Sequence, residues 1–191
     1  DVEGTETIIA TLSNEVVAAG TASITTASTT TNITELDAAV TFAIASTPSI
    51  SEDAEETATF TISLGGTLTG TNTASVDIAA SGDAISGTDY ENFIAAINTA
   101  ITGLGATPGV SFDGTTLTFT EDFVGSDFAF SVNAIDDSDV EGTETIIATL
   151  SNEVVAAGTA SITTASTTKN ITELDAAVTF AIASTPSISE D

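Results

Sequence analysis

Hydrophobic residues alternate with Thr and Ser along most of the chain, which is the pattern of strands that bury one face. The alternation predicts about eight strands, enough for a two-sheet sandwich. They are centred on residues 40–44, 60–64, 76–78, 110–112, 117–119, 128–132, 146–150 and 160–162. Asp113 and Gly114, between the fourth and fifth segments, are a typical hairpin turn pair.

One segment departs from this alternation and repeats its hydrophobic residues at helical spacing. Its apolar positions are Tyr90, Phe93, Ile94, Ile97 and Ile101. They predict an amphipathic helix over about residues 90–102, with Asp89 as its N-cap. A single apolar stripe usually packs on a core, so we expect the helix to cover an end or flank of the sandwich. The predicted fold class is all-β, an antiparallel immunoglobulin-like sandwich of about 7–9 strands with one inserted helix.

The chain contains a long internal repeat. Residues 139–191 repeat residues 1–53 with a single difference, Lys169 in place of Thr31, so corresponding positions lie 138 residues apart. A period of this length fits one domain per repeat. We interpret residues 1–37 as the C-terminal part of a preceding repeat, 38–175 as one complete repeat, and 176–191 as the first strand of the next. The Ser- and Thr-rich runs at 27–37 and 165–175 are interpreted as linkers.

The charge balance excludes several classes of function. The chain has 28 acidic residues, one basic residue and a formal net charge of -27. Binding to nucleic acid needs clustered Lys and Arg, and an anionic membrane surface would repel this chain. No apolar run approaches the roughly 18–20 residues of a membrane-spanning helix, so we expect no membrane insertion. Cysteine and histidine are absent, which excludes disulfides, zinc sites and Ser-His or Cys-His catalysis.

The acidic residues gather near the ends of predicted strands. The densest run holds Asp136, Asp137, Asp139, Glu141 and Glu144. Smaller groups include Glu52, Asp89, and the pair Glu173 and Asp175. Calcium is bound by six to eight oxygen atoms, so clustered carboxylates without nitrogen or sulfur donors favour calcium as the cofactor. The alternative is a solvated acidic face that keeps the protein in solution or adapts it to salt.

Three motifs in order resemble the Calx-beta fold, the calcium-binding immunoglobulin-like domain of sodium-calcium exchangers and of giant bacterial surface proteins. They are SISED at 49–53, GTDYE at 87–91 and IDDSDVEGTETIIATL at 135–150. The resemblance implies a calcium cluster at one pole of the sandwich, beside the junction with the neighbouring domain. Its ligands would come from Glu52, Asp89, Asp136, Asp137, Glu141 and Glu144, with Asp139 in the same acidic run and Glu173 and Asp175 where the family has further aspartates. Glu3, Glu6, Glu35 and Asp37 would serve the preceding domain.

These observations favour a structural repeat whose partners are neighbouring copies of itself, in the same chain or in a filament. We expect an extracellular bacterial fibre or adhesin stalk, stiffened by calcium. A ligand-binding adhesion module, for carbohydrate or protein, is the alternative. An enzyme is least favoured, because a glycosidase cleft is usually lined with aromatic residues and the chain has one Tyr and no Trp.

Overall fold

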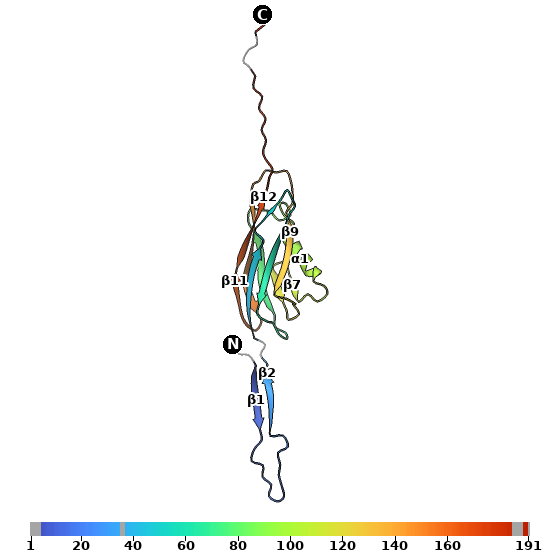
Figure 1. Ribbon diagram of the computed structural model, residues 1–191, viewed down its shortest axis with the longest axis vertical. Coiled ribbons are helices and arrows are strands. Elements are labelled where there is room, and N and C mark those ends of the chain that lie inside the picture. The colour runs from blue at the N-terminus through green and yellow to red at the C-terminus, as the bar shows by residue number, and fades with distance from the viewer. Residues whose placement is uncertain (1–4, 35–36, 185–188, 191) are drawn as a thin grey trace.

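The computed structural model describes residues 5–34, 37–184 and 189–190, and its centre is a sandwich of two β-sheets (Figure 1). One sheet has six strands in the order β4-β12-β10-β6-β8-β7, and the other has four in the order β11-β3-β5-β9. The sandwich strands are β3 (Ala38–Ser46), β4 (Ser49–Ser51), β5 (Thr57–Gly65), β6 (Ala74–Ser81), β7 (Val110–Phe112), β8 (Thr116–Phe119), β9 (Asp127–Asn133), β10 (Glu144–Val155), β11 (Gly158–Thr164) and β12 (Ser166–Thr172). The predicted all-β sandwich with one helix is confirmed. Two of its pairings, β11 with β3 and β12 with β4, are parallel.

The core forms where the alternating hydrophobic residues of both sheets face each other. Along β3, for example, Val40, Phe42 and Ile44 are buried, whereas the alternate residues Ala39 and Thr41 are exposed. Phenyl rings fill the centre of the interface. The rings of Phe60 and Phe130 stack with centroids 5.4 Å apart and an interplanar angle of 17°. Such pairs stabilise a core beyond the apolar area they bury.

A single helix in the described residues, α1 (Phe93–Gly103), packs on this aromatic group. The ring of Phe93 meets Phe130 edge-on, with centroids 4.9 Å apart. The helix begins three residues later than the predicted start at residue 90, because its N-cap is Asn92, whose side chain accepts a hydrogen bond from the Ala95 N–H at 2.9 Å. The prediction of Asp89 as N-cap is therefore wrong. Ile94, placed on the apolar stripe by its spacing, is 49% exposed. No helix in the described residues is long and apolar enough to cross a membrane.

The Ser- and Thr-rich run at 165–175, interpreted as a linker, is mostly strand β12. It pairs with β10 over Ser166–Ile171 and buries Lys169 and Ile171. Its first copy likewise contains strand β2 (Ser28–Ile33). Thr is β-branched and favours strands, so a neighbouring strand was enough to override the linker-like composition.

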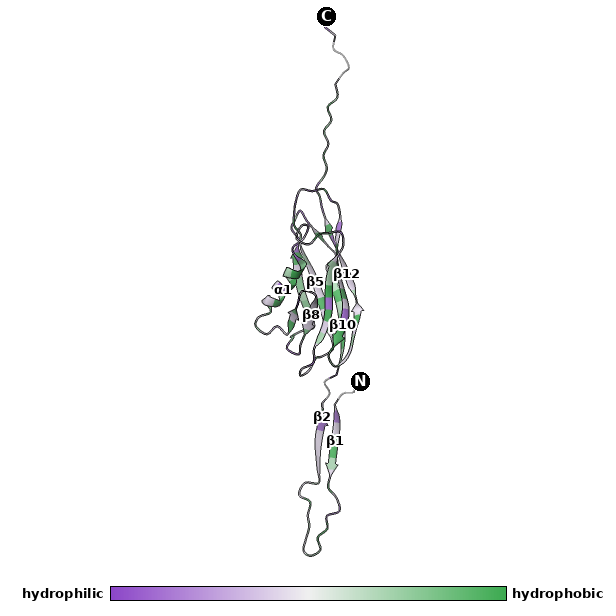
Figure 2. Cartoon of the chain, turned by 180° about the vertical axis from the view of Figure 1, so that it is seen from behind, coloured by the Kyte–Doolittle hydropathy of each residue, from purple (hydrophilic) through white to green (hydrophobic). Residues whose placement is uncertain are grey.

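The repeated sequence adopts two structures. Residues 6–33, which we call the N-terminal arm, form a hairpin of β1 (Glu6–Thr11) and β2 outside the sandwich (Figure 2). Its register, Glu6 opposite Ile33, is that of Glu144 opposite Ile171 in the sandwich. Residues 12–27 contain no strand, whereas residues 150–165 continue β10 and form β11. The difference follows from the neighbouring strands. In the sandwich, β10 pairs with β6, and β11 pairs with β3.

The chain passes through the sandwich from end to end. Strand β3 begins at the end that we call proximal, which faces the N-terminal arm (Figure 1). Thr172, the last residue of β12, pairs with Ser51 at the opposite, distal end. Residues 176–184, which we call the C-terminal tail, extend beyond the distal end without secondary structure (Figure 1).

Candidate metal centre

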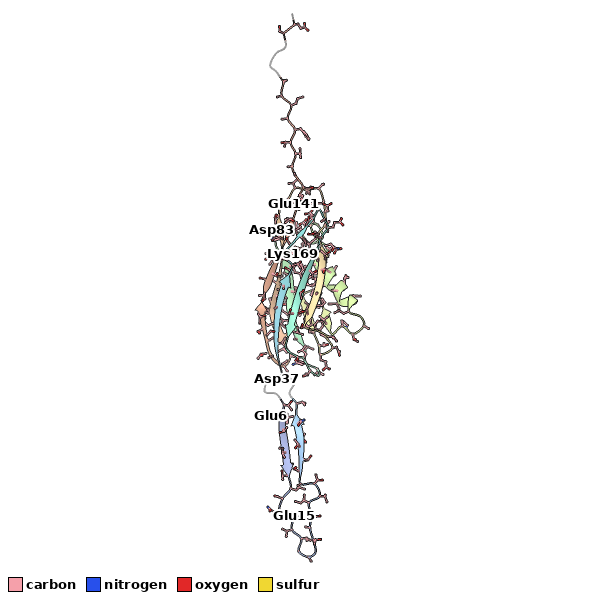
Figure 3. The ribbon with its side chains drawn as sticks, viewed as in Figure 1. Glu6, Glu15, Asp37, Asp83, Glu141 and Lys169 are labelled. Carbon is pink, nitrogen blue, oxygen red and sulfur yellow. The ribbon has the colours of Figure 1, made fainter. Side chains whose placement is uncertain are left out.

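Four chain segments bring acidic side chains together at the distal end. Glu52 follows β4, and Asp89 lies in the loop before α1. The loop between β9 and β10 carries an acidic run that ends with Glu144, the first residue of β10. Glu173 follows β12. Three of these segments begin or end at strands of one sandwich, so the strand pairings fix their meeting point. The bridge between Tyr90 and Ala134 holds the loop of Asp89 beside the end of β9. Figure 3 places Glu141 towards this end of the sandwich and Asp37 at the other end of the sandwich.

Asp89, Glu141 and Glu144 form the centre of the cluster. Each offers one carboxylate oxygen, and these oxygens all lie within 4.8 Å of one another. Two oxygens bound to one calcium ion lie no more than about 5 Å apart, since each bond is about 2.3–2.6 Å long. The three carboxylates could therefore share one ion.

Asp89 is held in place by backbone hydrogen bonds and is only 2% exposed. Its Oδ2 accepts a hydrogen bond from the Ile85 N–H at 2.5 Å, and its carbonyl accepts one from the Ile135 N–H at 2.9 Å. The helical spacing predicted this residue as a helix cap, and the Calx-beta resemblance implied that it is a ligand. The structure places its side chain in the acidic cluster.

Glu52 and Glu173 connect the surrounding loops to this centre. The Glu52 N–H donates to the Thr172 carbonyl at 3.0 Å, and its Oε1 accepts from the Asp137 N–H at 3.3 Å. Oε2 of Glu173 accepts from the N–H groups of Glu141 and Gly142, at 2.8 Å and 2.6 Å. Gly142 has a φ of +88°, a conformation that favours glycine. One oxygen of Glu173 thus orders the loop, while its other oxygen is left for a different partner.

The cluster is electrostatically strained because it holds several like charges. Burial, a hydrogen bond with Asp89 and the charges of Asp89, Glu141 and Glu52 raise the pKa of Glu144 to about 7. Burial and neighbouring carboxylates also raise the pKa of Glu52, Glu141 and Asp175. Two buried carboxylate oxygens, Oε2 of Glu144 and Oε1 of Glu173, have no hydrogen-bond partner. A buried acceptor without a partner costs free energy, and a bound cation would remove this cost.

Asp77, elsewhere in the sandwich, has hydrogen-bond donors for both of its carboxylate oxygens. Asp77 accepts hydrogen bonds from the Thr116 hydroxyl at 2.5 Å and from the Asn152 amide at 2.8 Å, which lower its pKa. The one basic side chain of the protein, Lys169, is fully buried and donates to the carbonyl and hydroxyl of Thr47. Lys169 therefore has its own partners and makes no described hydrogen bond to the distal acids.

The remaining candidate residues lie at the edge of the cluster or away from it. Asp136, Asp139 and Asp175 are exposed. The Asp139 N–H donates to the Asp137 carboxylate at 2.7 Å, and the charge of Asp136 contributes to the raised pKa of Asp175. In the first copy, Glu6 is exposed on β1 and Asp37 lies at the proximal end, so neither joins the distal cluster. Glu3 and Glu35 lie outside the described residues.

The candidate set omitted one acidic residue that the structure brings to the edge of the cluster. Oδ2 of Asp53 accepts a hydrogen bond from the Leu174 N–H at 3.0 Å. Its charge also contributes to the raised pKa of Asp175. The signal available in the sequence was its position directly after Glu52, in a run of acids that follows a predicted strand.

Comparison with known proteins gives structural similarities only. No protein-family model matches the chain, and no curated protein sequence matches it. A solved structure described as the apo form of the Calx CBD1 domain is similar, with a TM-score of 0.44 and 15% identity over 71% of this chain and 98% of that chain. A second, the calcium binding domain CBD12 of CALX1.1, has a TM-score of 0.42 and 16% identity over 71% of this chain and 44% of that chain. The Calx-beta resemblance of the sequence is thus accompanied by a structural similarity to Calx domains.

Proposed function

We propose that this chain is a structural repeat that binds calcium at the distal end of its sandwich, in an extracellular fibre or adhesin stalk of a bacterium. One observation carries the proposal. Carboxylates from four segments converge at one end of the sandwich, and two of their buried oxygens, on Glu144 and Glu173, have no partner. Structural ion pairs would explain such a cluster if bases were present, but the only basic side chain is bound to Thr47.

The donor set suits calcium better than other common metal ions. Calcium accepts six to eight oxygen ligands in flexible geometry, including carboxylates, backbone carbonyls and water. Magnesium demands a smaller octahedral shell and dehydrates reluctantly, so clustered carboxylates on separate loops favour it less. Zinc and copper sites use nitrogen and sulfur ligands, and this chain has no His or Cys.

A calcium ion at this position would connect loops that now repel one another. Asp89 belongs to the loop before α1, Glu141 and Glu144 to the start of β10, and Glu173 to the segment that leaves β12. Binding free energy adds to the stability of the assembled ligand set. Because Glu173 lies only three residues before the C-terminal tail, the ion would also fix the direction in which the chain leaves the sandwich.

The path of the chain supports an elongated array. The chain reaches the sandwich at the proximal end and leaves it at the distal end (Figure 1). From Thr172 to Ala176, the chain can extend at most about 14 Å, whereas the nine residues of β3 span roughly 26 Å. Residues 176–184 therefore cannot return to the β3 position of the same sandwich. We propose that residues 1–37 and 176–191 belong to preceding and following units, and that 38–175 is one complete unit.

The surface of the sandwich favours a spacer over a ligand-binding module. A carbohydrate or protein site would be expected to expose aromatic side chains around a cleft. In the described part of the chain, the one aromatic residue among the exposed large hydrophobic residues is Phe180, which lies in the tail. Tyr90, the single tyrosine, is 2% exposed. We infer a mechanical role without chemistry of its own.

Isothermal titration with calcium tests the proposed site. Asp89→Asn removes a charge from a buried carboxylate that backbone hydrogen bonds already hold in place. We expect the wild type to bind calcium, Asp89→Asn to bind at least tenfold more weakly, and the control Glu153→Gln, on β10 but distant from the cluster, to bind as the wild type does. Equal affinity of all three proteins, or no binding to the wild type, would contradict the proposed function.

A further inference from the structure

The two ends of the chain expose residues that the sandwich buries. The C-terminal tail repeats the sequence of β3 without its contacts. Phe42 is fully buried in β3, while its counterpart Phe180 is 95% exposed. The neighbouring inward positions behave in the same way: Val178 and Ile182 are 69% and 101% exposed, against 2% for both Val40 and Ile44. The tail therefore has the sequence of a core strand but makes none of the core contacts.

The N-terminal arm likewise exposes hydrophobic residues whose counterparts are buried in the sandwich. Ile8 and Ile33 are 57% and 45% exposed, whereas their counterparts Ile146 and Ile171 are at most 1% exposed. Leu12, at 66%, corresponds to Leu150 in the buried face of β10. A small unit that exposes apolar residues in a row is typical of a surface that binds a partner.

The sandwich shows how these two segments fit each other. Strand β11 pairs in parallel with β3, from Gly158 opposite Ala38 to Ile162 opposite Phe42. Side chains add to this pairing, since the Thr163 hydroxyl donates to the Phe42 carbonyl at 3.2 Å. The counterparts of β11 and β3 are residues 20–26 of the arm and 176–182 of the tail. The sequence that complements each end is thus carried at the other end of the chain.

The arm already has part of the backbone conformation that this pairing needs. Asn14 has a φ of 58° and Gly20 a φ of 106°, close to the 53° of Asn152 and the 113° of Gly158. The N–H of Leu12 donates to the Ala27 carbonyl at 2.8 Å, as that of Leu150 does to Ala165 at 2.7 Å. A partly preformed arm loses less conformational entropy when a strand binds to it.

One chain cannot pair its own ends, because the arm and the tail leave opposite ends of the sandwich (Figure 1). We propose that the C-terminal tail of one copy binds as a parallel strand beside residues 20–26 of a second copy, with Ala176 opposite Gly20 and Phe180 opposite Ile24. This inference rests on the proposed function only for the idea that copies are neighbours, and it does not require calcium. The contact joins two different surfaces, so repetition produces a linear head-to-tail assembly.

Gly20 provides a sharp test of this register. A Cβ at Gly158 would lie 2.1 Å from the carbonyl oxygen of Ala38, so β3 approaches too closely for any other residue. A Cβ at Gly20 meets nothing within 4 Å in the free arm. Gly20→Val should therefore block the incoming tail at Ala176, both by its side chain and by disfavouring the positive φ of 106° that the preformed arm needs, while leaving the sandwich intact.

The experiment is sedimentation velocity of the full chain over a wide range of concentrations, in calcium and in chelator. The wild type should associate, and Gly20→Val and Phe180→Asp should each remain monomeric. Thr179→Asp adds the same charge beside Phe180, at the counterpart of the exposed Thr41, and should associate as the wild type does.

A cysteine pair then tests the register, since the chain has no native cysteine. A mixture of Thr21→Cys and Ala177→Cys proteins should form heterodimers with a short crosslinker, because their counterparts Thr159 and Ala39 are paired. A mixture of Thr21→Cys with Ala183→Cys should crosslink far less. A wild type that stays monomeric, or association that Phe180→Asp and Thr179→Asp affect equally, would overturn the proposal. Calcium binding measured on the same samples shows separately whether the proposed function fails.

Discussion

Replacing Glu144 by Gln should have opposite effects on the protein with and without calcium. The side chain lies at the centre of the acidic cluster, and its Oε2 has no partner. In the absence of calcium, its charge is repelled by Asp89, Glu141 and Glu52. Gln keeps the shape of the side chain and removes this charge, so the metal-free protein should become more stable.

The size of the effect follows from the raised pKa of Glu144. A rise from 4.5 to about 7 corresponds to roughly 3 kcal/mol between the two protonation states at high pH. Because the side chain is partly exposed and salt screens its neighbours, we expect about 1–2 kcal/mol. The charged form is the one disfavoured by folding. The contribution of Glu144 to stability is therefore complete below about pH 4.5 and is lost as the pH rises through about 7.

Urea denaturation in chelator at pH 5 and pH 8 measures this difference. The free energy of unfolding of Glu144→Gln should exceed that of the wild type by about 1–2 kcal/mol at pH 8 and by much less at pH 5. Glu153→Gln, on the same strand about 30 Å away by strand length, controls for the loss of one negative charge. In calcium the wild type should be the more stable of the two proteins, since Gln is a poorer calcium ligand than Glu. Equal stabilisation by the two variants at pH 8 would refute the reasoning, because it would assign the effect to net charge.

Three further predictions concern the sandwich itself. Gly82→Ala should lower the free energy of unfolding by about 2 kcal/mol or more, because its φ is +119° and a Cβ would lie 2.1 Å from the Thr145 carbonyl oxygen; an unchanged urea midpoint would contradict this geometry. Burial lowers the pKa of Lys169, so the wild type should gain stability relative to Lys169→Met as the pH rises towards 10.5, and parallel pH profiles of the two proteins would show that the ammonium is not desolvated. Deleting residues 1–33 should leave the melting temperature of the sandwich unchanged, because β1 and β2 pair only with each other; a lower melting temperature would assign the arm to the same folding unit.

The sequence predicted the core well because one physical rule governs it. Positions such as Phe42 and Phe130 alternate with polar residues, and a strand that buries one face must show this alternation. The pattern failed where burial was not visible in the composition. Strand β12 has few apolar residues, so its pairing with β10 could not be told from a flexible linker. The start of α1 was placed too early because Tyr90 has helical spacing but packs before the helix begins.

The repeated segments show the limit of prediction from sequence directly. Residues 12–27 and 150–165 have the same sequence, but only the second set forms long strands. The partners β6 and β3 decide the outcome, and local sequence does not contain them. The same limit applies to the candidate site. Strand ends identified Glu52, Asp89 and Glu144 as neighbours, while the hydrogen bonds by which Glu173 holds the β9–β10 loop depend on loop conformation.

Calcium bound at the distal acidic cluster should stabilise the sandwich. The most direct test is the melting temperature of the full chain in chelator and in saturating calcium, at fixed ionic strength and neutral pH. An ion present at about 100 times its Kd adds roughly 2.7 kcal/mol to the free energy of unfolding. This corresponds to a rise in melting temperature of about 5–10 °C for a domain of this size. We expect such a rise for the wild type and little or none for Asp89→Asn. Equal melting temperatures of the wild type in calcium and in chelator would contradict the claim.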